Sequence, residues 1–488
     1  MDPWLLKKYI LLVHGESKGA MDYLDGTTQR SISLPKGFHG VIHKPLVFQD
    51  ADQALEYVCK IYNNHVTQLK LLANSEIEFV HNITYPYVGI YVPTDQDGVL
   101  KGYYGTTISH PEVLYDYYYE QFRVITEEHR VPIWIGHSTY PMSLVFIDED
   151  LFNGLAVTKK LCPSYLPCMR RIQQGLHSSE IRPLSAFHGE RTGYSLNRLH
   201  HYCGTDARFF QNTVIFANYH IYAQFFIEYA KAEVLAGRAT CLLGPGIKFT
   251  ASDGFIKNEK VFNPQMPAYH LVREHRNGIT LINVNVGPSN VKTITDHIAV
   301  LRSHRWIMLG HCAGLRNDNK IGDYVIGHNY VRYDYVLDSY IPKHVPIPSS
   351  TYLTKLFVKV AEARNQNSIS LGTIVTTCDR NWELNPVMID EFSDAKATAI
   401  DMESATVATN AFRFGVDSLA FLCITDMPLH GAPKIRSMAQ EFYRTRVEDH
   451  FKICMEACKE AIDDVNRAYT KDDSLQYSHY KNAVTPFR

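Results

Sequence analysis

The 488-residue sequence lacks a large excess of charge of either sign, because 49 Lys and Arg residues nearly balance 51 Asp and Glu residues. A chain this close to neutral has no overall field that attracts nucleic acid or an anionic membrane surface. We therefore expect neither kind of partner. Any anionic ligand must be bound by a local cluster of basic side chains.

The sequence also lacks the run of about 18 uninterrupted apolar residues that a membrane-spanning helix needs. Its apolar segment at residues 4–13 is short and is broken by Lys7 and Lys8, and no small-residue cleavage site follows, so we expect no signal peptide. The ten cysteines include no Cys-x-x-Cys pair; Cys454 and Cys458 fall on one helical stripe, which predicts buried thiols. These absences favour a reduced, cytoplasmic protein, and we predict no metal site.

The length allows two to four domains at roughly 100–200 residues each. The first part has an α+β pattern without catalytic signatures, with a helical segment at residues 55–69 and a strand-like segment at residues 85–92. Irregular, proline-containing sequence at residues 161–183 suggests a boundary. We predict a smaller N-terminal α+β domain at residues 1–178 and a second domain at residues 179–488.

The second part alternates strands and helices. Residues 280–286 and 306–309 have the apolar character of buried strands, and each is followed by a glycine-containing segment that we predict to be a turn, Gly287-Pro-Ser-Asn290 and Gly310-His-Cys-Ala-Gly314. Strands separated by helices imply a mixed, mostly parallel sheet covered by helices, so the predicted fold class is α/β. The sequence contains no internal repeat.

Two carboxylates follow strands of this second part. Residues 399–431 have a strand–helix–strand pattern, with Glu403 at the end of the first strand and Asp426 at the end of the second. Ligands of open α/β sheets bind at the carboxyl ends of strands. Two carboxylates there suggest chemistry on a sugar bond, where one group protonates the leaving group and the other orients the ring or the water. We expect Asp401 and Glu403 to share one side of the strand, with Met402 on the other.

Each carboxylate also has a simpler interpretation. Glu403 could merely cap the helix predicted at residues 404–414, and Asp426 could open the Pro-Leu-His-Gly turn that follows it. In the functional interpretation, Glu403 suits the 2′,3′-diol of a ribose. Burial at the end of an apolar strand would raise the pKa of Asp426, so that it could carry a proton to a leaving group at neutral pH.

Further candidates lie in the segments between strands and helices. Gly287 and Ser289 precede a helix whose free N–H groups could bind an anion, although an ordinary strand–helix turn is the commoner explanation. Gly310 would line the same site if the two predicted turns face each other. Asn381 and Trp382 could read and stack on a base, but tryptophan is equally common as a core residue.

Basic side chains cluster at Arg191, Arg198, His200 and His201. In a chain with almost no net charge, this cluster is a candidate for the local anion site. Arg198, Arg191 or Arg316, with backbone N–H groups near Gly287, could bind a phosphate group. A solvated surface is the alternative interpretation.

Together these segments resemble the nucleoside phosphorylase and nucleosidase superfamily, which has a Gly-Pro-Ser turn, a Met-Glu pair and a Ser/Thr-Asp strand end. More narrowly, the sequence is similar to the AMP nucleosidase family in three segments of the second part: Asp379-Arg-Asn-Trp-Glu383, Asp401-Met-Glu-Ser-Ala-Thr406 and Asp426-Met-Pro-Leu-His-Gly431. Tyr194-Ser-Leu and, in the first part, Tyr103-Tyr-Gly-Thr-Thr-Ile108 add to the likeness. The resemblance covers nearly the whole length.

The resemblance implies hydrolysis of AMP to adenine and ribose 5-phosphate, in purine salvage and control of AMP level. It implies that Asp426 protonates purine N7, Glu403 holds the ribose hydroxyls and Met402 packs against the nucleoside. His311 stands where related phosphorylases have a small hydroxyl residue that holds phosphate, and Met308 where they have an arginine. Both departures favour water over phosphate as the nucleophile.

The resemblance further implies an N-terminal regulatory domain, activation by MgATP, inhibition by phosphate and a homohexamer, with no cofactor required for the chemistry. A phosphate-dependent purine nucleoside or nucleotide phosphorylase is the alternative, and a catalytically inactive nucleotide sensor is a third possibility. The effector site could involve Lys101, Thr106 and Thr107, although a surface turn explains these residues equally well.

Overall fold

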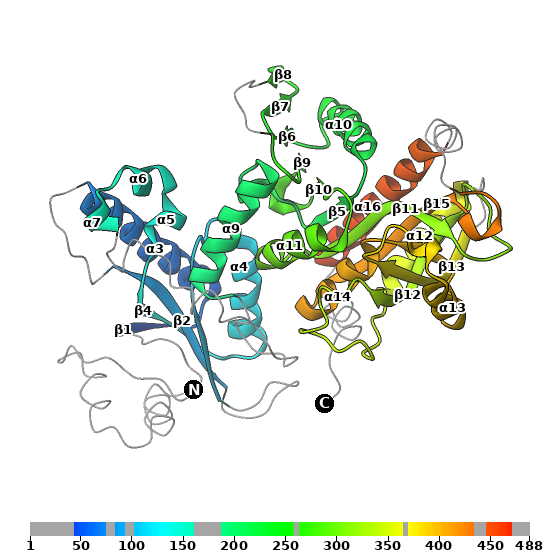
Figure 1. The fold of residues 1–488 in the computed structure, drawn as a ribbon. Helices are drawn as coiled ribbons and strands as arrows, with labels where there is room; N and C mark the ends of the chain where they lie inside the picture. The colour runs from blue at the N-terminus through cyan, green and yellow to red at the C-terminus, as the bar shows by residue number, and fades with distance from the viewer. Residues whose placement is uncertain are drawn as a thin grey trace. The chain divides into compact units, whose positions relative to one another are not determined.

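The computed structural model describes residues 43–74, 83–92, 102–160, 187–257, 263–364, 369–433 and 446–470. These divide into two compact units, residues 43–197 and residues 198–470, which are described separately (Figure 1). Four predicted features lie outside the described residues: the apolar segment at residues 4–13, Lys101, the irregular sequence at residues 161–183 and the domain boundary after residue 178.

The N-terminal unit contains a four-stranded antiparallel sheet in the order β1-β4-β2-β3. Its strands are β1 (His43–Phe48), β2 (Thr84–Val92), β3 (Gly102–Thr107) and β4 (Ile133–Pro141). Its helices are α3 (Ala51–Ala73), α4 (Tyr115–Arg123), a π-helical turn (Val124–Glu128), α5 (Leu144–Ile147), α6 (Glu149–Gly154) and α7 (Val157–Lys160). A further helix, α9 (Gly189–Cys203), begins in this unit.

Helix α3 forms where the sequence predicts a helix. Asp50 caps it by accepting a hydrogen bond from the N–H of Gln53 at 2.8 Å. Leu55, Tyr62 and Leu69 recur at helical spacing and are buried. The predicted N-terminal α+β fold is therefore confirmed.

The threonines considered for an effector site lie on β3 and are buried. Thr107 Oγ1 accepts a hydrogen bond from the N–H of Gly189 at 2.9 Å. The interpretation of Thr106 and Thr107 as a surface turn is therefore wrong.

The second unit is built on a mixed sheet of 11 strands within the described residues, in the order β14-β13-β12-β15-β11-β5-β10-β9-β6-β7-β8. Its strands are β5 (Thr213–Ala217), β6 (Cys241–Gly244), β7 (Ile247–Thr250), β8 (Gly254–Lys257), β9 (Ala268–Val272), β10 (Ile279–Asn283), β11 (Arg305–Gly314), β12 (Tyr324–Tyr333), β13 (Ile369–Thr377), β14 (Ala399–Asp401) and β15 (Asp417–Asp426).

The centre of the sheet is parallel and buried. Strand β5 is parallel to both β10 and β11, and β11 is parallel to β15. Every residue of these four strands is buried, as their nearly continuous apolar runs predict. Antiparallel pairs form the outer strands from β9 to β8. The predicted mixed sheet covered by helices is confirmed.

Strand β14 closes part of this sheet into a ring. It pairs in parallel with β13 and in antiparallel with the end of β11, where Ala313 lies opposite Ile400. The ring consists of β11, β15, β12, β13 and β14. This pairing also shows that the turn predicted at residues 310–314 is wrong, because β11 continues as a strand to Gly314. The strand predicted at residues 280–286 ends earlier, at Asn283.

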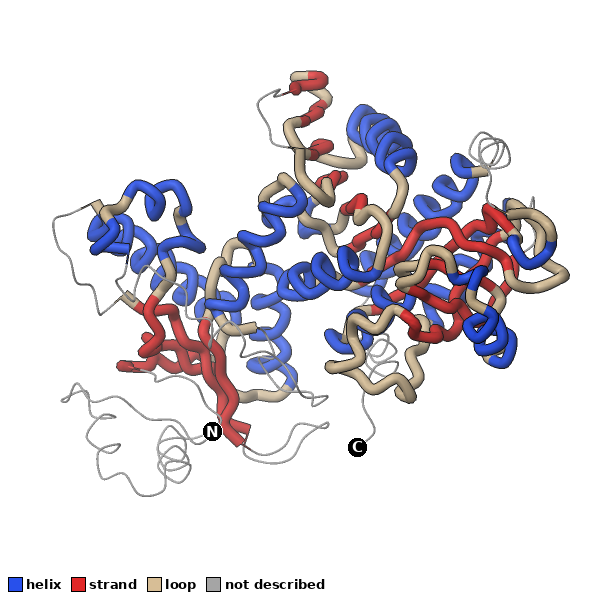
Figure 2. The backbone as a smooth tube through the Cα atoms, in the orientation of Figure 1, coloured by secondary structure: helices blue, strands red, loops and turns tan. Residues whose placement is uncertain are grey.

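Helices lie on both sides of the strands in the second unit (Figure 2). They are α10 (His220–Leu235), α11 (Pro288–Ile298), α12 (Thr351–Arg364), α13 (Pro386–Asp394), α14 (Ser404–Phe414) and α16 (Val447–Thr470). Short 3₁₀ turns occupy Ala207–Phe209, Glu274–Arg276, Ala299–Leu301, Trp382–Leu384 and Pro428–His430. Among the described helices, none combines the length and the apolar character needed to cross a membrane.

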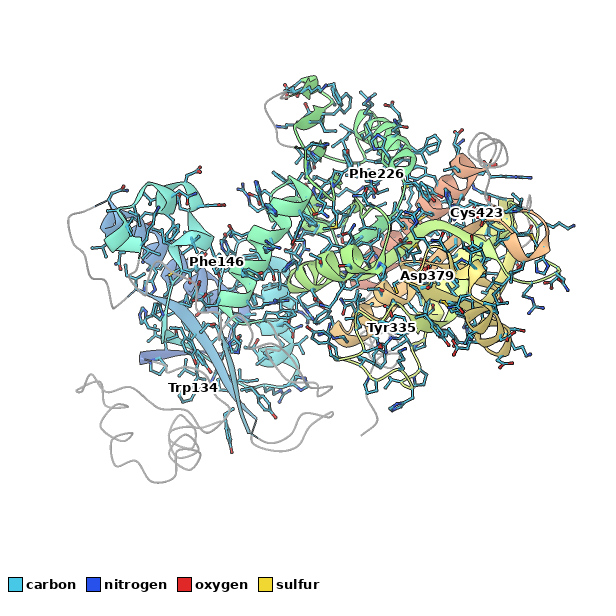
Figure 3. The ribbon with its side chains drawn as sticks, in the orientation of Figure 1. Trp134, Phe146, Phe226, Tyr335, Asp379 and Cys423 are labelled. Carbon is cyan, nitrogen blue, oxygen red and sulfur yellow. The ribbon has the colours of Figure 1, made fainter. Side chains whose placement is uncertain are left out.

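One large core brings α10, α12 and α16 together against the strands. It includes Phe226 on α10, Phe357 on α12 and Phe451 on α16; Phe226 is labelled in Figure 3. Cys454 and Cys458 on α16 are buried in this core, as predicted. Helices α11 and α14 form a separate pair that is joined by hydrogen bonds. Both helices begin next to predicted site residues.

Candidate functional site

Glu403 lies directly before α14, and its side chain does not cap that helix. Its Oε1 accepts a hydrogen bond from the N–H of Gly287 at 2.6 Å, and its Oε2 accepts one from Nδ2 of Asn218 at 3.0 Å. The residue is only 1% exposed. The interpretation of Glu403 as a helix cap is therefore wrong, and the structure uses its carboxyl group to join three separate elements.

Gly287 supplies its N–H because of its backbone conformation. Its φ is +115°, a value that side chains rarely permit, and a Cβ at this position would have nothing within 4 Å. Pro288 then begins α11, and Asn290 Nδ2 donates to the carbonyl of Val284 at 3.2 Å. The first N–H group before α11 is thus bound by the carboxyl group of Glu403. Ser289, in the same turn, is exposed.

Asn218 is a site residue that the sequence interpretation missed. It follows the last residue of β5 and is 8% exposed. Its Nδ2 donates to Glu403, whereas its Oδ1 has no hydrogen-bond partner among the described residues. A Cβ on Gly310 would lie 3.0 Å from that oxygen. An apolar segment that ends in a polar residue, the same signal that identified Asp426, would have found Asn218.

Asp401 takes the capping role at α14. Its Oδ2 accepts hydrogen bonds from the N–H and the Oγ of Ser404 at 2.9 and 2.5 Å, and its Oδ1 accepts one from Thr376 Oγ1 at 2.6 Å. The prediction that Asp401 and Glu403 share one side of a strand is wrong, because β14 ends at Asp401 and the chain turns before Glu403. Met402, between them, is half-buried.

The two carboxyl groups are electrostatically linked. The pKa of Glu403 is raised to about 8, first by burial and then by the charge of Asp401, while hydrogen bonds from Gly287 and Asn218 act in the opposite direction. Burial raises the pKa of Asp401 to about 6, against hydrogen bonds from Ser404 and Thr376. At neutral pH Asp401 is therefore mainly ionised, and Glu403 holds its proton in the unliganded protein.

Asp426 is the last residue of β15 and is buried. The hydroxyl of Thr425 donates to its Oδ1 and also lies 3.3 Å from the carbonyl of Cys312. The register between β11 and β15 shifts at this point, so that Asp426 pairs with Ala313. Because Ala313 also faces Ile400 on β14, the strand that carries Asp426 and the strand that precedes Glu403 both flank the end of β11.

Trp382 lies in a small core rather than on a surface. Its side chain is 7% exposed and packs in a cluster that includes Ala313, Phe392 and Ile400, with its ring centroid 5.9 Å from that of Phe392. This environment favours the interpretation of Trp382 as a core residue. Asn381 is exposed beside it, in the loop that follows Asp379, which is labelled in Figure 3.

His311 points away from Gly310, because neighbouring residues of β11 face opposite sides of the sheet. Its Nε2 lies 2.9 Å from the hydroxyl of Tyr222 on α10, which in turn lies 2.7 Å from Nδ1 of His450 on α16. Its ring centroid is 4.5 Å from that of Tyr219. The imidazole of His311 is therefore buried against the start of α10, on the side of the large core, and Tyr222 links it to α16.

The predicted basic cluster is divided between the two units. Arg198 donates to the hydroxyl of Tyr202, and its guanidinium lies 4.5 Å from the centre of that ring. Tyr202 stacks on His297 with ring centroids 6.2 Å apart. Arg191 belongs to the N-terminal unit, where its guanidinium lies 6.0 Å from the ring centre of Phe187.

Comparison with known proteins agrees with this architecture. A family model described as the phosphorylase superfamily matches residues 248–460, and one described as the bacterial AMP nucleoside phosphorylase N-terminus matches residues 53–162. The AMP nucleosidase of Escherichia coli strain K12 is 37% identical over 380 residues, which cover 73% of this chain and 78% of that protein. A guanosine phosphorylase of Halorubrum lacusprofundi is 27% identical over 161 residues, covering 32% of this chain and 65% of that protein.

Among solved structures, the crystal structure of AMP nucleosidase from Bacteroides thetaiotaomicron is 23% identical, with a TM-score of 0.42; the match covers 56% of this chain and 97% of that one. The fold and the matched family models define a phosphorylase-type domain preceded by a second, smaller domain. On the identity and coverage shared with the E. coli protein, the chain belongs to the AMP nucleosidase family. The resemblance seen in the sequence is thereby confirmed.

The raised pKa of Glu403 predicts that stability depends on pH. Between its ordinary pKa of 4.5 and about 8, the folded state binds more protons than the unfolded state, so the free energy of unfolding falls as pH rises. Glu403→Gln cannot ionise, and Asn218 can turn its amide to accept from the new side chain. We expect the thermal midpoint of the wild type to fall more steeply from pH 4.5 to about pH 8 than that of the variant. Parallel curves would contradict the assignment.

Proposed function

We propose that this chain hydrolyses the N-glycosidic bond of AMP and releases adenine and ribose 5-phosphate. One observation carries the proposal: a buried Glu403 carboxyl group is held by Gly287 and Asn218 in a chain 37% identical to an AMP nucleosidase. Each carboxylate oxygen has a second lone pair beyond the one that these donors use. The carboxylate form of Glu403 can therefore accept hydrogen bonds from both hydroxyls of a ribose diol.

Asp426 takes the role of the acid. It shares or donates a proton at purine N7, so that adenine leaves as a neutral base while the ribose ring gains oxocarbenium character. Met402 packs against the nucleoside, and Glu403 holds the ring while water attacks. The burial of Asp426 at the end of β15, on the strand next to β11, supports this division of roles.

The environment of His311 supports water rather than phosphate as the nucleophile. Its imidazole is 5% exposed and bonded to Tyr222, and Met308 on the same strand is fully buried and uncharged. Met308 cannot carry a charge, and His311 Nε2 is engaged by the Tyr222 hydroxyl rather than held open for a free phosphate ion. The alternative is a phosphate-dependent purine nucleotide phosphorylase, which would form ribose 1,5-bisphosphate. The similarity of part of the chain to a guanosine phosphorylase is the observation that favours this alternative.

The remaining assignments are part of the same proposal. We assign the 5′-phosphate to Arg198 in the second unit, with help from Ser289 in the first turn of α11, whose helix N-terminus favours an anion. Arg191 belongs to the other unit, and its part in phosphate binding stays a prediction. Asn381 contacts the base from the exposed loop before α13, and Trp382 supports that loop from the core.

We further propose a cytoplasmic homohexamer that acts in purine salvage and control of AMP level. The N-terminal unit is its regulatory domain, MgATP is an activator and phosphate an inhibitor, and the chemistry needs no cofactor. The match of residues 53–162 to the N-terminal family model supports a dedicated role for that unit.

The products of the reaction test the proposal. We expect purified protein incubated with AMP to release adenine and ribose 5-phosphate with or without added phosphate, and to do so faster with MgATP. Chromatography separates these products. Ribose 1,5-bisphosphate formed only with phosphate would establish the phosphorylase instead, and no release of adenine under any condition would establish an inactive sensor.

Substitution of the acid tests the mechanism. Asp426→Asn removes the ionisable group but keeps its size, and we expect kcat to fall by about 10²–10⁴-fold while AMP binding, measured by calorimetry, is kept. Asp253→Asn is a matched control, because Asp253 is exposed in the turn between β7 and β8 and accepts a hydrogen bond from Thr250 nearby. Turnover of Asp426→Asn near the wild-type rate, with binding intact, would show that Asp426 is not the acid.

A further inference from the structure

A buried hydrogen-bond network joins β13, β14 and the first turn of α14. Asp401 on β14 accepts from Thr376 Oγ1 on β13 at 2.6 Å and from the N–H of Ser404 at 2.9 Å. The same Thr376 oxygen accepts from the N–H of Ala405 at 2.8 Å. Asp401 is 5% exposed, and the other three residues are exposed by 1% or less.

This network fixes the chain on both sides of Glu403. Asp401 lies two residues before it, and the N–H groups of Ser404 and Ala405, directly after it, are both bound. These are among the N–H groups that the start of a helix leaves without a partner inside the helix. The backbone before and after Glu403 is therefore tied to two different strands.

We propose that Asp401 is a positioning residue: together with Thr376 it fixes the backbone around Glu403, so that the Glu403 carboxyl group faces Gly287 and Asn218. Both carboxylate oxygens of Asp401 accept hydrogen bonds within this network. Asp401 therefore acts on the reaction through Glu403. The inference rests on the proposed function only in taking Glu403 as the group that holds the ribose.

The charge of Asp401 gives the network a measurable signature. Burial is the largest cause of the raised pKa of Glu403, and Asp401 is the charged group that contributes most to it. Titratable and charged groups also lie on the elements packed against β14 and α14: Tyr330, Arg332, Asp334, Asp296, His311 and Asp426. Asp401 ionises at lower pH than Glu403, so Asp401 is charged while Glu403 titrates. Removing the charge of Asp401 should therefore lower the pKa of Glu403.

The hydroxyl of Thr376 tests the positioning role without touching a carboxylate. We expect Thr376→Val to lower kcat/KM for AMP by about 10- to 100-fold, because the first turn of α14 loses an anchor and Glu403 moves out of place. Thr376→Ser keeps the hydroxyl and should stay within about threefold of the wild type. Thr409→Val is the matched control, since Thr409 is buried on α14 and its hydroxyl has no partner among the described residues.

Asp401→Asn tests the charge. This variant can still accept from Ser404 but carries no charge, so we expect the rise of kcat/KM with pH to move to lower pH, with the carboxylate of Glu403 as the active form. The titration of Glu403 in the unliganded protein is followed independently by the infrared band of its protonated carboxyl group, identified as the band missing from Glu403→Gln. That titration should move in the same direction.

The inference would be overturned if Glu403 titrated at the wild-type pH in Asp401→Asn, or if Thr376→Val kept the wild-type kcat/KM. Loss of activity in Thr376→Val matched by an equal loss in Thr376→Ser would also overturn it. If Asp401→Asn does not fold, the kcat/KM values of Thr376→Val and Thr376→Ser decide whether the network positions Glu403. If the wild type releases no adenine, the proposed function fails, whereas the infrared titration still decides whether Asp401 controls Glu403.

Discussion

Glu403 carries its carboxyl group into the interior of the second unit, where the N–H of Gly287 and the amide of Asn218 meet it. Burying an ionised carboxyl group is unfavourable unless hydrogen-bond donors replace the lost water. The pKa of Glu403 stays raised, because the two donors offset only part of this desolvation. The start of α11, the end of β5 and the start of α14 must therefore converge on one point. The same convergence fixes the position of the carboxyl group that we propose as the acceptor for the ribose diol.

The topology of the sheet brings these partners together across the chain. Glu403 lies 185 residues from Asn218 and 116 residues from Gly287 in the sequence. Parallel pairing of β5 with β10 and β11 puts the ends of three strands at one edge, and β14 reaches that edge by pairing with β11 in the opposite direction. Ring closure by a strand of only three residues, Ala399–Asp401, thus positions both carboxylates that precede α14.

The sequence predicts the parts of this site that depend on local patterns. Glu403 and Gly287 were identifiable because each follows an apolar strand and precedes a helix. The strand character of residues 310–314 was not, because it arises from pairing with β15 and β14, contacts distant in sequence that override the turn tendency of the two glycines. Likewise, the cluster that buries Trp382 includes Ala313 from β11, and the partner of His311 is Tyr222, 89 residues away in the sequence. Local spacing contains no information about such partners.

The central claim is that Glu403 holds the ribose diol, and the most direct test compares AMP with 2′-deoxy-AMP in the wild type and in Glu403→Gln. Loss of a hydrogen bond to a charged group costs about 1.5–3 kcal/mol, so the wild type should prefer AMP by about 10- to 100-fold in kcat/KM. The account predicts that Glu403→Gln loses most of this preference. A variant that keeps the full wild-type preference for AMP would contradict it.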